Sequence, residues 1–447
     1  MSASGVDRCH VLDWAACGAM ALTGPPDGAA VTSPAPALSL LRRVAGQLAE
    51  VTRQVGREVR ADPAELIAGR AGLSGFTRRG QASAGGSSRL LATADGWCAV
   101  TLSRADDIAA VPALLAILGA GTGGEPASAQ AAWAMLGPAA GQRTARELAD
   151  GAQLLGIPAA TLPRQAPAPA CPAASSRPQE PPWPPWRAAS IAARSPGASL
   201  RGAVVADLSS MWAGPLCARL LGLAGARVIK VESADRLDGA RSADQRFYDW
   251  LHAGHESLVI PFRTGRGRSV LARLLSVADV VIEASRPRAL AQLGLAPGSF
   301  WHREGQVWLS ITGYGRDHPE RVAFGDDAAV AGGLVGQAAD GKPVFCADAI
   351  ADPLTGITGA LAIARSVAAG GGELLDLPMR AVAASFAAAT APDHGQHDLS
   401  PDGSSVTCRA LGRRQAVLPP RPPTPAPGRA AAPGADTEAI SAWLESV

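Results

Sequence analysis

Asp352 is the residue whose neighbours most favour covalent chemistry. It is followed by Pro353 and by a run of small residues that includes Gly356 and Gly359. Aspartate before proline is ordinary chemistry for the start of a helix, so a helix cap is one interpretation. The helix dipole and nearby N–H groups would also keep such a carboxylate ionised, as nucleophilic attack on an acyl group requires. The two interpretations are compatible, and both glycines would let a bulky ligand approach the backbone.

Two further pairs of titratable residues could take part in catalysis. Asp326 and Asp327 follow Gly325, and paired carboxylates can act as acid and base. A solvated turn or a helix cap is the interpretation that we favour for them. His252 and His255 precede a predicted strand. They could contact ligand phosphates, and a role in a turn explains them equally well.

The cysteines and the C-terminal histidines give little indication of a metal. The seven cysteines are scattered, odd in number and without a C-x-x-C motif, which fits reduced thiols better than a disulfide framework or a zinc site. Cys217 is better explained as a packed thiol than as a nucleophile. Metal binding is one interpretation of His394 and His397, and an exposed tail is the one that we favour. We therefore expect no metal.

A strand, a helix and a second strand in the middle of the chain predict a ligand-binding unit. Ala203–Leu208 is a short apolar run, typical of a strand that is buried on both faces. Gly214 and Pro215 then break the chain, and Pro215 suits a first helical turn. An apolar stripe extends to Leu223, and Val228–Val231 begins the next strand. Right-handed crossover units of this kind bind ligands at the carboxyl ends of their strands.

The same alternation continues towards the C-terminus. Strands that alternate with helices of about ten residues indicate a parallel sheet covered on both faces. The fold class that we predict is therefore α/β. The expected strands are residues 257–262, 278–283 and 306–312, and the expected helices are residues 267–277 and 287–293.

Composition divides the chain into five regions. Residues 1–163 form a first block, with an expected helix at residues 36–55, and residues 201–385 carry the alternating pattern. The regions that follow each block are rich in proline and alanine, which predicts extended linkers. These linkers are residues 164–200 and 386–435, and residues 436–447 form a closing helix.

Charge and hydropathy exclude several classes of protein. The 447 residues carry a formal net charge of +2, which is too small to favour nucleic acid or a membrane surface as a partner. No apolar run reaches the roughly 18 residues of a membrane span. The N-terminal residues do not show the basic segment and following apolar segment of a secretory signal, so none is expected. Lys230 and Lys342 are the only lysines. With reduced thiols, these features favour a cytoplasmic location.

Several segments occur together in an order that characterises one family. They are Asp207–Leu208 with Ala213–Pro215, Gly225–Glu232, Ala278–Glu283 with Arg286-Pro287, Ser310–Gly315 and Ile350–Asp352. On these segments, residues 201–385 resemble the family III CoA-transferases, which include formyl-CoA transferase, carnitine CoA-transferase and α-methylacyl-CoA racemase. The resemblance implies a Rossmann-like parallel sheet with helices on both faces, plus a smaller α+β domain.

Segments outside that range resemble other parts of the family in a different order. They are Trp14–Asp27, Asp95–Trp97, Gly156–Ala159 and Gly434–Glu438. The chain therefore resembles two incomplete copies fused in shuffled order. Residues 1–163 would be the degenerate copy, because no carboxylate stands among residues 31–36, where the nucleophile would fall.

The resemblance also implies a reaction. Asp352 aligns with the family's catalytic aspartate, which attacks an acyl-CoA thioester to form a mixed anhydride and then an aspartyl-CoA thioester. An incoming carboxylate accepts the CoA, and N–H groups near Gly370–Gly372 would stabilise the oxyanion. The contacts with coenzyme A fall on Ser210, Trp212, Arg263 and Ser285, to which we add Arg286 and Arg288 because guanidinium groups suit phosphates.

Two alternatives to CoA transfer stay open. The racemase branch of the family has a histidine where this chain has Asp326, so an isomerase would need Asp326 as its base. The missing histidine argues for a transferase. A non-catalytic acyl-CoA-binding protein is the second alternative, because the first copy is degenerate. The family forms interlocked homodimers, so the resemblance implies a homodimer as well.

Overall fold

A seven-stranded sheet forms the centre of the molecule. The computed structural model describes residues 8–121, 124–163 and 183–447; part of the expected linker, residues 164–182, lies outside the described residues. The strand order is β4-β12-β9-β8-β5-β6-β7, and all neighbours are parallel except β4. The predicted α/β class is therefore confirmed. The strands are β4 (Arg187–Ser190), β5 (Val204–Asp207), β6 (Arg227–Ser233), β7 (Glu256–Ile260), β8 (Val280–Glu283), β9 (Val307–Thr312) and β12 (Glu373–Pro378).

The order of the strands reverses between β5 and β8. From β5 the chain passes through α8 (Ala213–Leu223) to β6, and through α9 (Gln245–His252) to β7. It then returns through α10 (Gly265–Val277) to β8, on the other side of β5. Ligands of open α/β sheets bind outside the carboxyl ends of the strands at such a reversal. The segments after Asp207 and Glu283 begin at this position.

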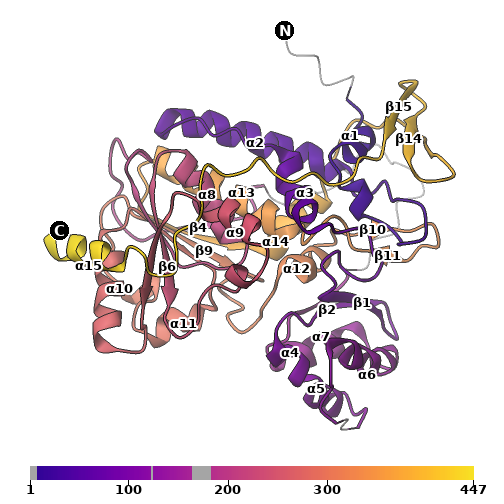
Figure 1. The fold of residues 1–447 in the computed structure, drawn as a ribbon, viewed down its shortest axis with the longest axis horizontal. Helices are drawn as coiled ribbons and strands as arrows, with labels where there is room; N and C mark the ends of the chain where they lie inside the picture. Colours follow the sequence, from indigo (N-terminus) through magenta and orange to yellow (C-terminus); the bar gives the residue numbers. More distant parts are fainter. Residues whose placement is uncertain (1–7, 122–123, 164–182) are drawn as a thin grey trace.

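Alternate residues of each strand enter two separate cores. In β8, Val280 and Ile282 pack with α8, while Val281 packs with α10, α11 (Pro287–Gln292) and α15 (Thr437–Ser446). This alternation follows from the pleat of a strand whose two faces are both covered. Figure 1 shows α2 (Pro36–Val55) on one side of the sheet and α10 and α11 on the other.

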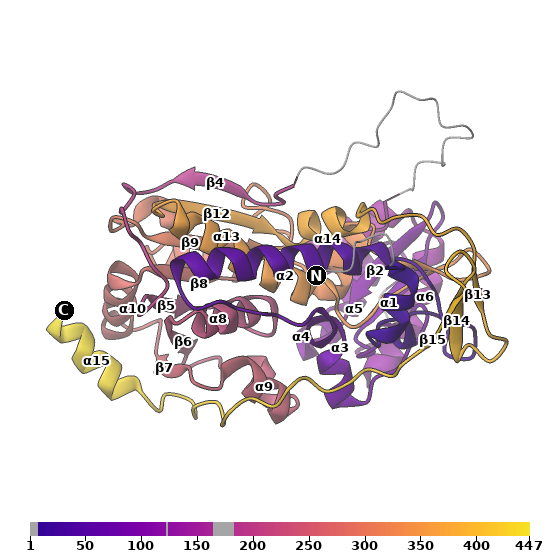
Figure 2. The same cartoon turned by 90° about the horizontal axis from the view of Figure 1, so that it is seen from above.

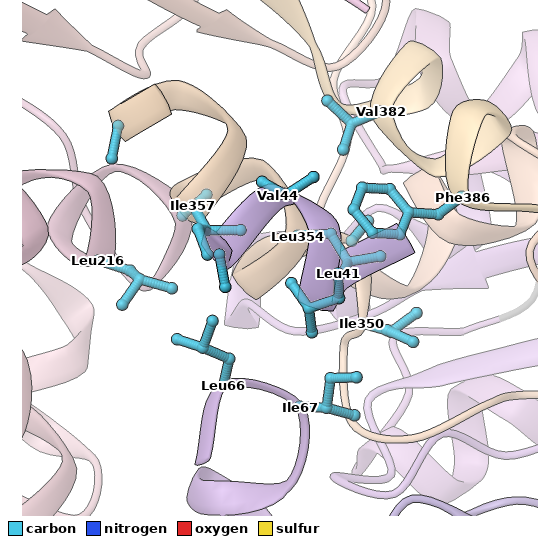
Figure 3. Close-up of a cluster of buried hydrophobic side chains, with 14 of the residues drawn as sticks. Leu41, Val44, Leu66, Ile67, Leu216, Ile350, Leu354, Ile357, Val382 and Phe386 are labelled. Atoms are coloured by element: carbon cyan, nitrogen blue, oxygen red, sulfur yellow. The ribbon is translucent and has the colours of Figure 1, made fainter. Parts of the chain in front are cut away.

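Helix α13 (Ala351–Ala368) is the centre of the first core. Almost every residue of α13 is buried, and the helix packs against α8, α2 and α14 (Met379–Ala387). Burying a leucine or isoleucine side chain stabilises the fold by about 1.5–3 kcal/mol, so this core fixes where α13 begins. Figure 3 shows side chains from these helices and from α3 (Pro63–Ser74): Leu41, Val44, Leu66, Ile67, Leu216, Ile350, Leu354, Ile357, Val382 and Phe386.

The first block of the chain contributes to two different cores. Helices α1 (His10–Ala16), α2 and α3 join the core around α13. Residues 88–161 instead form a small unit with its own core, at the lower right of Figure 1. Its elements are β1 (Ser88–Ala92), β2 (Trp97–Thr101), α4 (Ala105–Ala109), α5 (Val111–Ile117), α6 (Ala129–Gly141), α7 (Ala145–Leu154) and β3 (Ala159–Thr161).

After α14 the chain forms a small sheet and then crosses the molecule. Strands β13 (His397–Leu399), β14 (Ser405–Cys408) and β15 (Arg413–Ala416) pair antiparallel, and α1 packs on them. The following segment runs to the opposite end of the molecule, where α15 lies (Figures 1 and 2).

The start of α15 covers the edge of the large sheet. The backbone N–H groups of Ser257 and Val259 in β7 donate hydrogen bonds to the side chains of Asp436 and Thr437, at 2.8 and 3.1 Å. The N–H of Asp436 donates in turn to the carbonyl oxygen of Ser257 at 3.1 Å. These contacts occupy polar groups of β7 that no other strand among the described residues pairs.

Candidate active site

Asp352 lies in the first turn of α13, at the carboxyl edge of the sheet. The N-cap residue is Ile350, so the interpretation of Asp352 as a helix cap is wrong. Its carboxylate accepts a hydrogen bond from the N–H of Ala213, the first residue of α8, which follows β5. The side chain is half-buried, and its neighbours include charged groups.

The turn before α13 has a strained backbone. Ala347 and Ala349 have φ angles of 54° and 41°, a left-handed conformation that residues with a Cβ atom rarely adopt. Between them, the buried Asp348 accepts two hydrogen bonds from Arg70 of α3, at 2.8 and 2.6 Å. A bidentate pair of this kind fixes geometry as well as charge. The contact with Arg70 therefore anchors the turn that sets the start of α13.

Three carboxylates share one cation at this position. Asp326, Asp348 and Asp352 interact electrostatically with one another and with Arg70. Burial raises the pKa of Asp352 to about 7, with repulsion from Asp326 and Asp348 added and attraction by Arg70 opposing. Burial and Asp348 likewise raise the pKa of Asp326. Near neutral pH, Asp352 is thus partly protonated and partly ionised. The sequence predicts an ionised carboxylate, because it indicates only the start of the helix and not the burial of the side chain.

Gly325 brings α12 (Gly325–Ala331) close to Asp352. A Cβ atom on Gly325 would lie 2.3 Å from Oδ2 of Asp352 and 2.4 Å from the carbonyl oxygen of Ala349. Only glycine fits such a contact without displacing the carboxylate or the backbone. The next residue, Asp326, accepts a hydrogen bond from Ser88 Oγ at 2.9 Å.

The small unit of residues 88–161 holds the other carboxylate of α12. Ser88 Oγ and Thr101 Oγ1 lie 2.9 Å apart, and Thr101 donates to Oδ1 of Asp327 at 3.0 Å. Asp327 also accepts from the N–H of Phe324 at 3.0 Å, so it caps the start of α12 as one interpretation predicted. It is fully buried, not solvated, and burial raises its pKa to about 8.

A second carboxylate cluster supports the turn after β5. The ammonium of the buried Lys230 lies 2.9 Å from Oδ2 of Asp238 and 4.0 Å from Oδ2 of Asp207. Lys230 also donates to the carbonyl oxygen of Ser209. Asp238 accepts from the N–H of Met211 at 3.0 Å, and Met211 has a φ of 74°. The network therefore holds a left-handed turn in place.

That turn exposes Ser210 and buries Trp212. Trp212 is 2% exposed, and its ring lies 4.6 Å from the guanidinium carbon of Arg70. Phe247 packs edge-on against it, with ring centroids 5.2 Å apart. Trp212 therefore positions Arg70, whereas the exposed Ser210 is open to a ligand.

Arg286 belongs to a cluster of arginines after β8. Its guanidinium lies next to Gly156, whose carbonyl oxygen accepts a hydrogen bond from Arg104 at 2.8 Å. Burial, with the like charges of Arg288 and Arg104, lowers the pKa of Arg286. Like charges held together in this way favour an anion between them. The cluster joins the large sheet to the unit of residues 88–161.

The other expected coenzyme A contacts differ in exposure. Arg288 and Arg263 form ion pairs of 2.8 and 3.7 Å, and Arg263 is 89% exposed. Ser285 is half-buried. The structure brings Ser285 and Arg286 to the edge of the sheet where Ser210 also lies, because β5 and β8 are neighbours that end there.

The glycines that we expected to admit a ligand serve packing. A Cβ atom on Gly356 would lie 2.8 Å from the carbonyl oxygen of Ala213, and one on Gly359 would lie 3.0 Å from Leu309. Gly370–Gly372 follow the far end of α13, whose 18 residues span about 27 Å. Their N–H groups are bonded to backbone carbonyl groups, so the predicted oxyanion role of this loop is wrong.

Several other candidates are buried. His252 and His255 are 2% and 8% exposed, and burial lowers the pKa of both, so neither binds phosphate as a cation. Cys217 is fully buried, and burial raises its pKa, as expected for a packed thiol. His394 is buried and His397 half-buried, so the interpretation of these two as an exposed tail is wrong.

A cavity of about 520 Å³ lies beside α3. Gly72, Phe76, Arg78 and Pro420 are among the residues that line it, and Asp352 is not. Phe76 lies 5.9 Å from the guanidinium of Arg70. Phe76 thus lines the cavity and also lies close to the cation of the carboxylate cluster.

Comparison with known proteins matches the second half of the chain to one family. Residues 200–420 match the model of a family described as CoA-transferase family III. A succinate–glutarate CoA-transferase of Agrobacterium fabrum is 32% identical over 203 residues, which cover 40% of this chain and 50% of the relative. A formyl-CoA:oxalate CoA-transferase of Escherichia coli is 27% identical over 174 residues, which cover 35% and 41%. The chain spans about half the length of these relatives.

A solved structure is also similar in part. A CAIB/BAIF family protein from Brucella suis has a TM-score of 0.37 and 28% sequence identity, and the match covers 43% of this chain and 55% of that one. The family match and the names of the relatives support a family III CoA-transferase. Across the described ranges, no helix is both long enough and apolar enough to cross a membrane.

Proposed function

We propose that this protein is a family III CoA-transferase that moves CoA from an acyl-CoA thioester to a carboxylic acid. The observation that carries the proposal is the environment of Asp352, half-buried at the carboxyl edge of the sheet and with a pKa of about 7. Weak solvation favours a carboxylate as a nucleophile, provided that enough of it is ionised. Near neutral pH, Asp352 is weakly solvated and a substantial fraction of it is ionised, so it meets both conditions.

Each step exchanges one bond at an acyl carbon. A carboxylate oxygen of Asp352 attacks the thioester carbon, and the CoA thiolate leaves, which gives a mixed anhydride. The thiolate then attacks the side-chain carbonyl carbon of Asp352 and displaces the donor carboxylate, which gives an aspartyl-CoA thioester. The acceptor carboxylate takes the same two steps in reverse and regenerates Asp352. The scheme consumes no proton, electron or metal.

The arginines after β8 are our proposed site for the phosphates of CoA. Arg286 has no carboxylate at ion-pair distance in the described part of the chain, and it lies near Arg104 and Arg288. An anion would relieve the repulsion between these guanidinium groups. Ser210 and Ser285 lie at the same edge, so they would contact the neighbouring part of CoA.

The strand order supports the finer parts of the proposal. Read from β7 to β12, it is the 3-2-1-4-5-6 order of a Rossmann sheet. Arg70 and Ser88, from the first block, contact Asp348 and Asp326 of the second, as expected if two shuffled copies share one set of catalytic parts. We further propose a homodimer, on the resemblance alone, and a cytoplasmic location, on the composition and the scattered thiols.

Trapping the aspartyl intermediate tests the reaction. The protein would be incubated with a panel of acyl-CoA thioesters, treated with hydroxylamine or borohydride, and digested for mass spectrometry. The label is expected on Asp352 and should be lost in Asp352→Asn. Asp326→Asn, next to the site, should keep the label. A label on any other carboxylate, or none with every thioester, would overturn the mechanism.

The arginine site has its own test. Arg286→Ala should raise the KM for acyl-CoA about tenfold, equivalent to about 1.4 kcal/mol, and leave kcat within a factor of about two. Arg60→Ala is the matched control, because its side chain is 84% exposed and lies outside the expected contacts with coenzyme A, so its KM should stay unchanged. Equal KM values for the two variants would contradict the proposed placement.

An acyl-CoA isomerase is the second candidate, and one observation favours it. Asp326 lies within electrostatic range of Asp352, and its raised pKa suits a general base. Exchange of the α-proton of an acyl-CoA for deuterium, without transfer of CoA to any acceptor, would establish this activity. Transfer without exchange would exclude it.

A further inference from the structure

Two cysteines and three histidines gather where α1 meets the small C-terminal sheet. Cys9, His397 and Cys408 each place one potential ligand atom within 4.8 Å of the others. The ring of His10 lies 6.2 Å from that of His397 and 6.4 Å from that of His394. The whole chain has seven cysteines and seven histidines. Two of these cysteines and three of these histidines therefore lie together at one place, outside the carboxylate cluster.

The local fold explains why these side chains meet. His397 of β13 and Cys408 of β14 are directly paired in the antiparallel register, so their side chains lie side by side on one face of the sheet. Val406 and Cys408 are both buried, which identifies this face as the inner one. Helix α1 packs on β14, as Figure 1 shows, and Cys9 is its N-cap residue.

Some polar atoms of the cluster are hydrogen-bonded to each other, and two buried histidine nitrogens have no partner among the described residues. Cys9 Sγ and His397 Nε2 are 2.9 Å apart. Nδ1 of His10 and Nδ1 of His394 are buried, and neither has a hydrogen-bond partner among the described residues. His394 is only 9% exposed. A buried polar atom without a partner costs about 1–3 kcal/mol, so the arrangement is explained more simply if these nitrogens and thiols surround an ion.

We propose that Cys9, His397 and Cys408 bind a zinc ion, with His10 or His394 as the fourth ligand. Two thiolates and two imidazoles in a tetrahedral arrangement are typical of zinc, with Zn–S and Zn–N distances of about 2.3 and 2.0 Å. Four protein ligands leave no open coordination position, so the ion is structural and takes no part in the proposed CoA transfer. The site departs from our expectation of no metal.

Such an ion would stabilise the small C-terminal sheet. Strands β13 to β15 have three or four residues each, and a sheet of this size is marginal without further packing. Zinc binding adds its free energy to folding, because the ligands come together only in the folded chain. The ion would tie residue 9 to residues 397–408 and so fix α1 against the C-terminal sheet.

Metal analysis of the full chain tests the proposal. The protein would be produced without a histidine tag in zinc-supplemented medium, and its metal measured by inductively coupled plasma mass spectrometry. About one zinc per chain is expected. Cys9→Ser, His397→Ala and Cys408→Ser should lose it. Cys17→Ser is the matched control, because Cys17 lies at the other end of α1 and outside the cluster, and it should keep full zinc.

A second measurement guards against variants that fail to fold. Cobalt(II) replacing zinc in the unaltered protein should give the visible absorption of a tetrahedral thiolate site. Cys9→His, which restores a ligand, should bind zinc where Cys9→Ser does not. A chelator should lower the thermal midpoint of the unaltered protein and leave that of Cys9→Ser unchanged.

Three results would overturn the site. The first is unaltered protein that stays free of zinc after reconstitution under reducing conditions. The second is a disulfide between Cys9 and Cys408 in protein prepared from a reducing lysate. The third is full zinc affinity in the double variant His10→Ala/His394→Ala, because one of these two side chains must supply the fourth ligand.

Discussion

Two carboxylate clusters contact opposite ends of the turn between β5 and α8, and they differ in charge balance. At Ser209 the cluster consists of Asp207 and Asp238 with Lys230, and all three side chains are buried. Burial alone would raise the pKa of Asp238, but the ammonium of Lys230 lowers it below its usual range. The carboxylate of Asp238 is therefore held as an ion, whereas burial raises the pKa of Asp207 against the attraction of Lys230.

At Trp212 the balance is different. Arg70 is the cation of a cluster with three carboxylates, and it lies against the Trp212 ring. Asp352 and Asp326 are half-buried there, and both have raised pKa values. In the first cluster, one buried ammonium is shared by two buried carboxylates. We call this cluster of Lys230, Asp207 and Asp238 the scaffold. In the second cluster, the guanidinium of Arg70 is shared by three carboxylates, two of them half-buried. The negative charge of Asp352 is therefore poorly compensated, which makes its carboxylate available for reaction.

Removing the cation of the scaffold should have the largest effect. Lys230→Met leaves Asp207 and Asp238 buried and uncompensated, so the free energy of unfolding in urea should fall by about 3–5 kcal/mol. Lys342→Met is the matched control, at a side chain 56% exposed, and should change it by less than about 0.5 kcal/mol. Equal losses in both variants would contradict the scaffold role.

Removing the cation of the second cluster should change the pH dependence of turnover. Arg70→Gln should raise the pKa of Asp352, because attraction by Arg70 holds it down. A smaller share of Asp352 would then be ionised at pH 7, so the rate there should fall about fivefold to tenfold and recover at higher pH. The measurement is kcat/KM against pH, with Arg53→Gln, exposed on α2, as control. If the acid limb of this profile does not move in Arg70→Gln, Arg70 does not control the pKa of Asp352.

Removing one carboxylate should have a smaller effect in the opposite direction. Asp326→Asn takes away a negative charge that raises the pKa of Asp352, so the acid limb of the same profile should move to lower pH. Asp317→Asn, at an exposed carboxylate, should leave it in place. A move to higher pH in Asp326→Asn would mean that Asp326 assists ionisation of Asp352.

The smallest expected effect is on stability. The pKa of Asp352 is about 7 in the folded protein, against an ordinary value of 3.8. Between these values the folded state binds a proton that the unfolded chain releases, so stability falls as pH rises through this range. Asp352→Asn should therefore melt at a higher temperature than the unaltered protein at pH 8, by the equivalent of about 1 kcal/mol, and at the same temperature near pH 4. A lower midpoint at pH 8 would show that its charge stabilises the fold.

Sequence predicted the central strands because their apolar runs are local. The expected helix at residues 36–55 is α2 with the same bounds, and β8 and β9 lie within the expected ranges. Two strands of the sheet were missed for a physical reason. All four residues of β4 are exposed at the edge of the sheet, so no apolar pattern marks it. In β12 the run of apolar residues is interrupted by Asp376.

Parts of the candidate site could be proposed from the sequence only where they are close together along the chain. Asp352 and Ser210 belong to segments whose local pattern the family resemblance covers. Arg70 was missed because its partner, Asp348, is 278 residues away, and nothing near Arg70 distinguishes it from other arginines of the chain. Cys9 and Cys408 were missed in the same way, since no metal motif has a spacing of that length.

The closing segment has a consequence for how molecules behave towards one another. Asp436 and Thr437 occupy the N–H groups of Ser257 and Val259 at the β7 edge. A chain lacking residues 436–447 would lose Ile440 and Leu444 from the second core and leave both of these N–H donors of β7 unpaired. Unpaired donors on an edge strand can pair with strands of other chains, so we expect the truncated chain to aggregate more readily than the full chain.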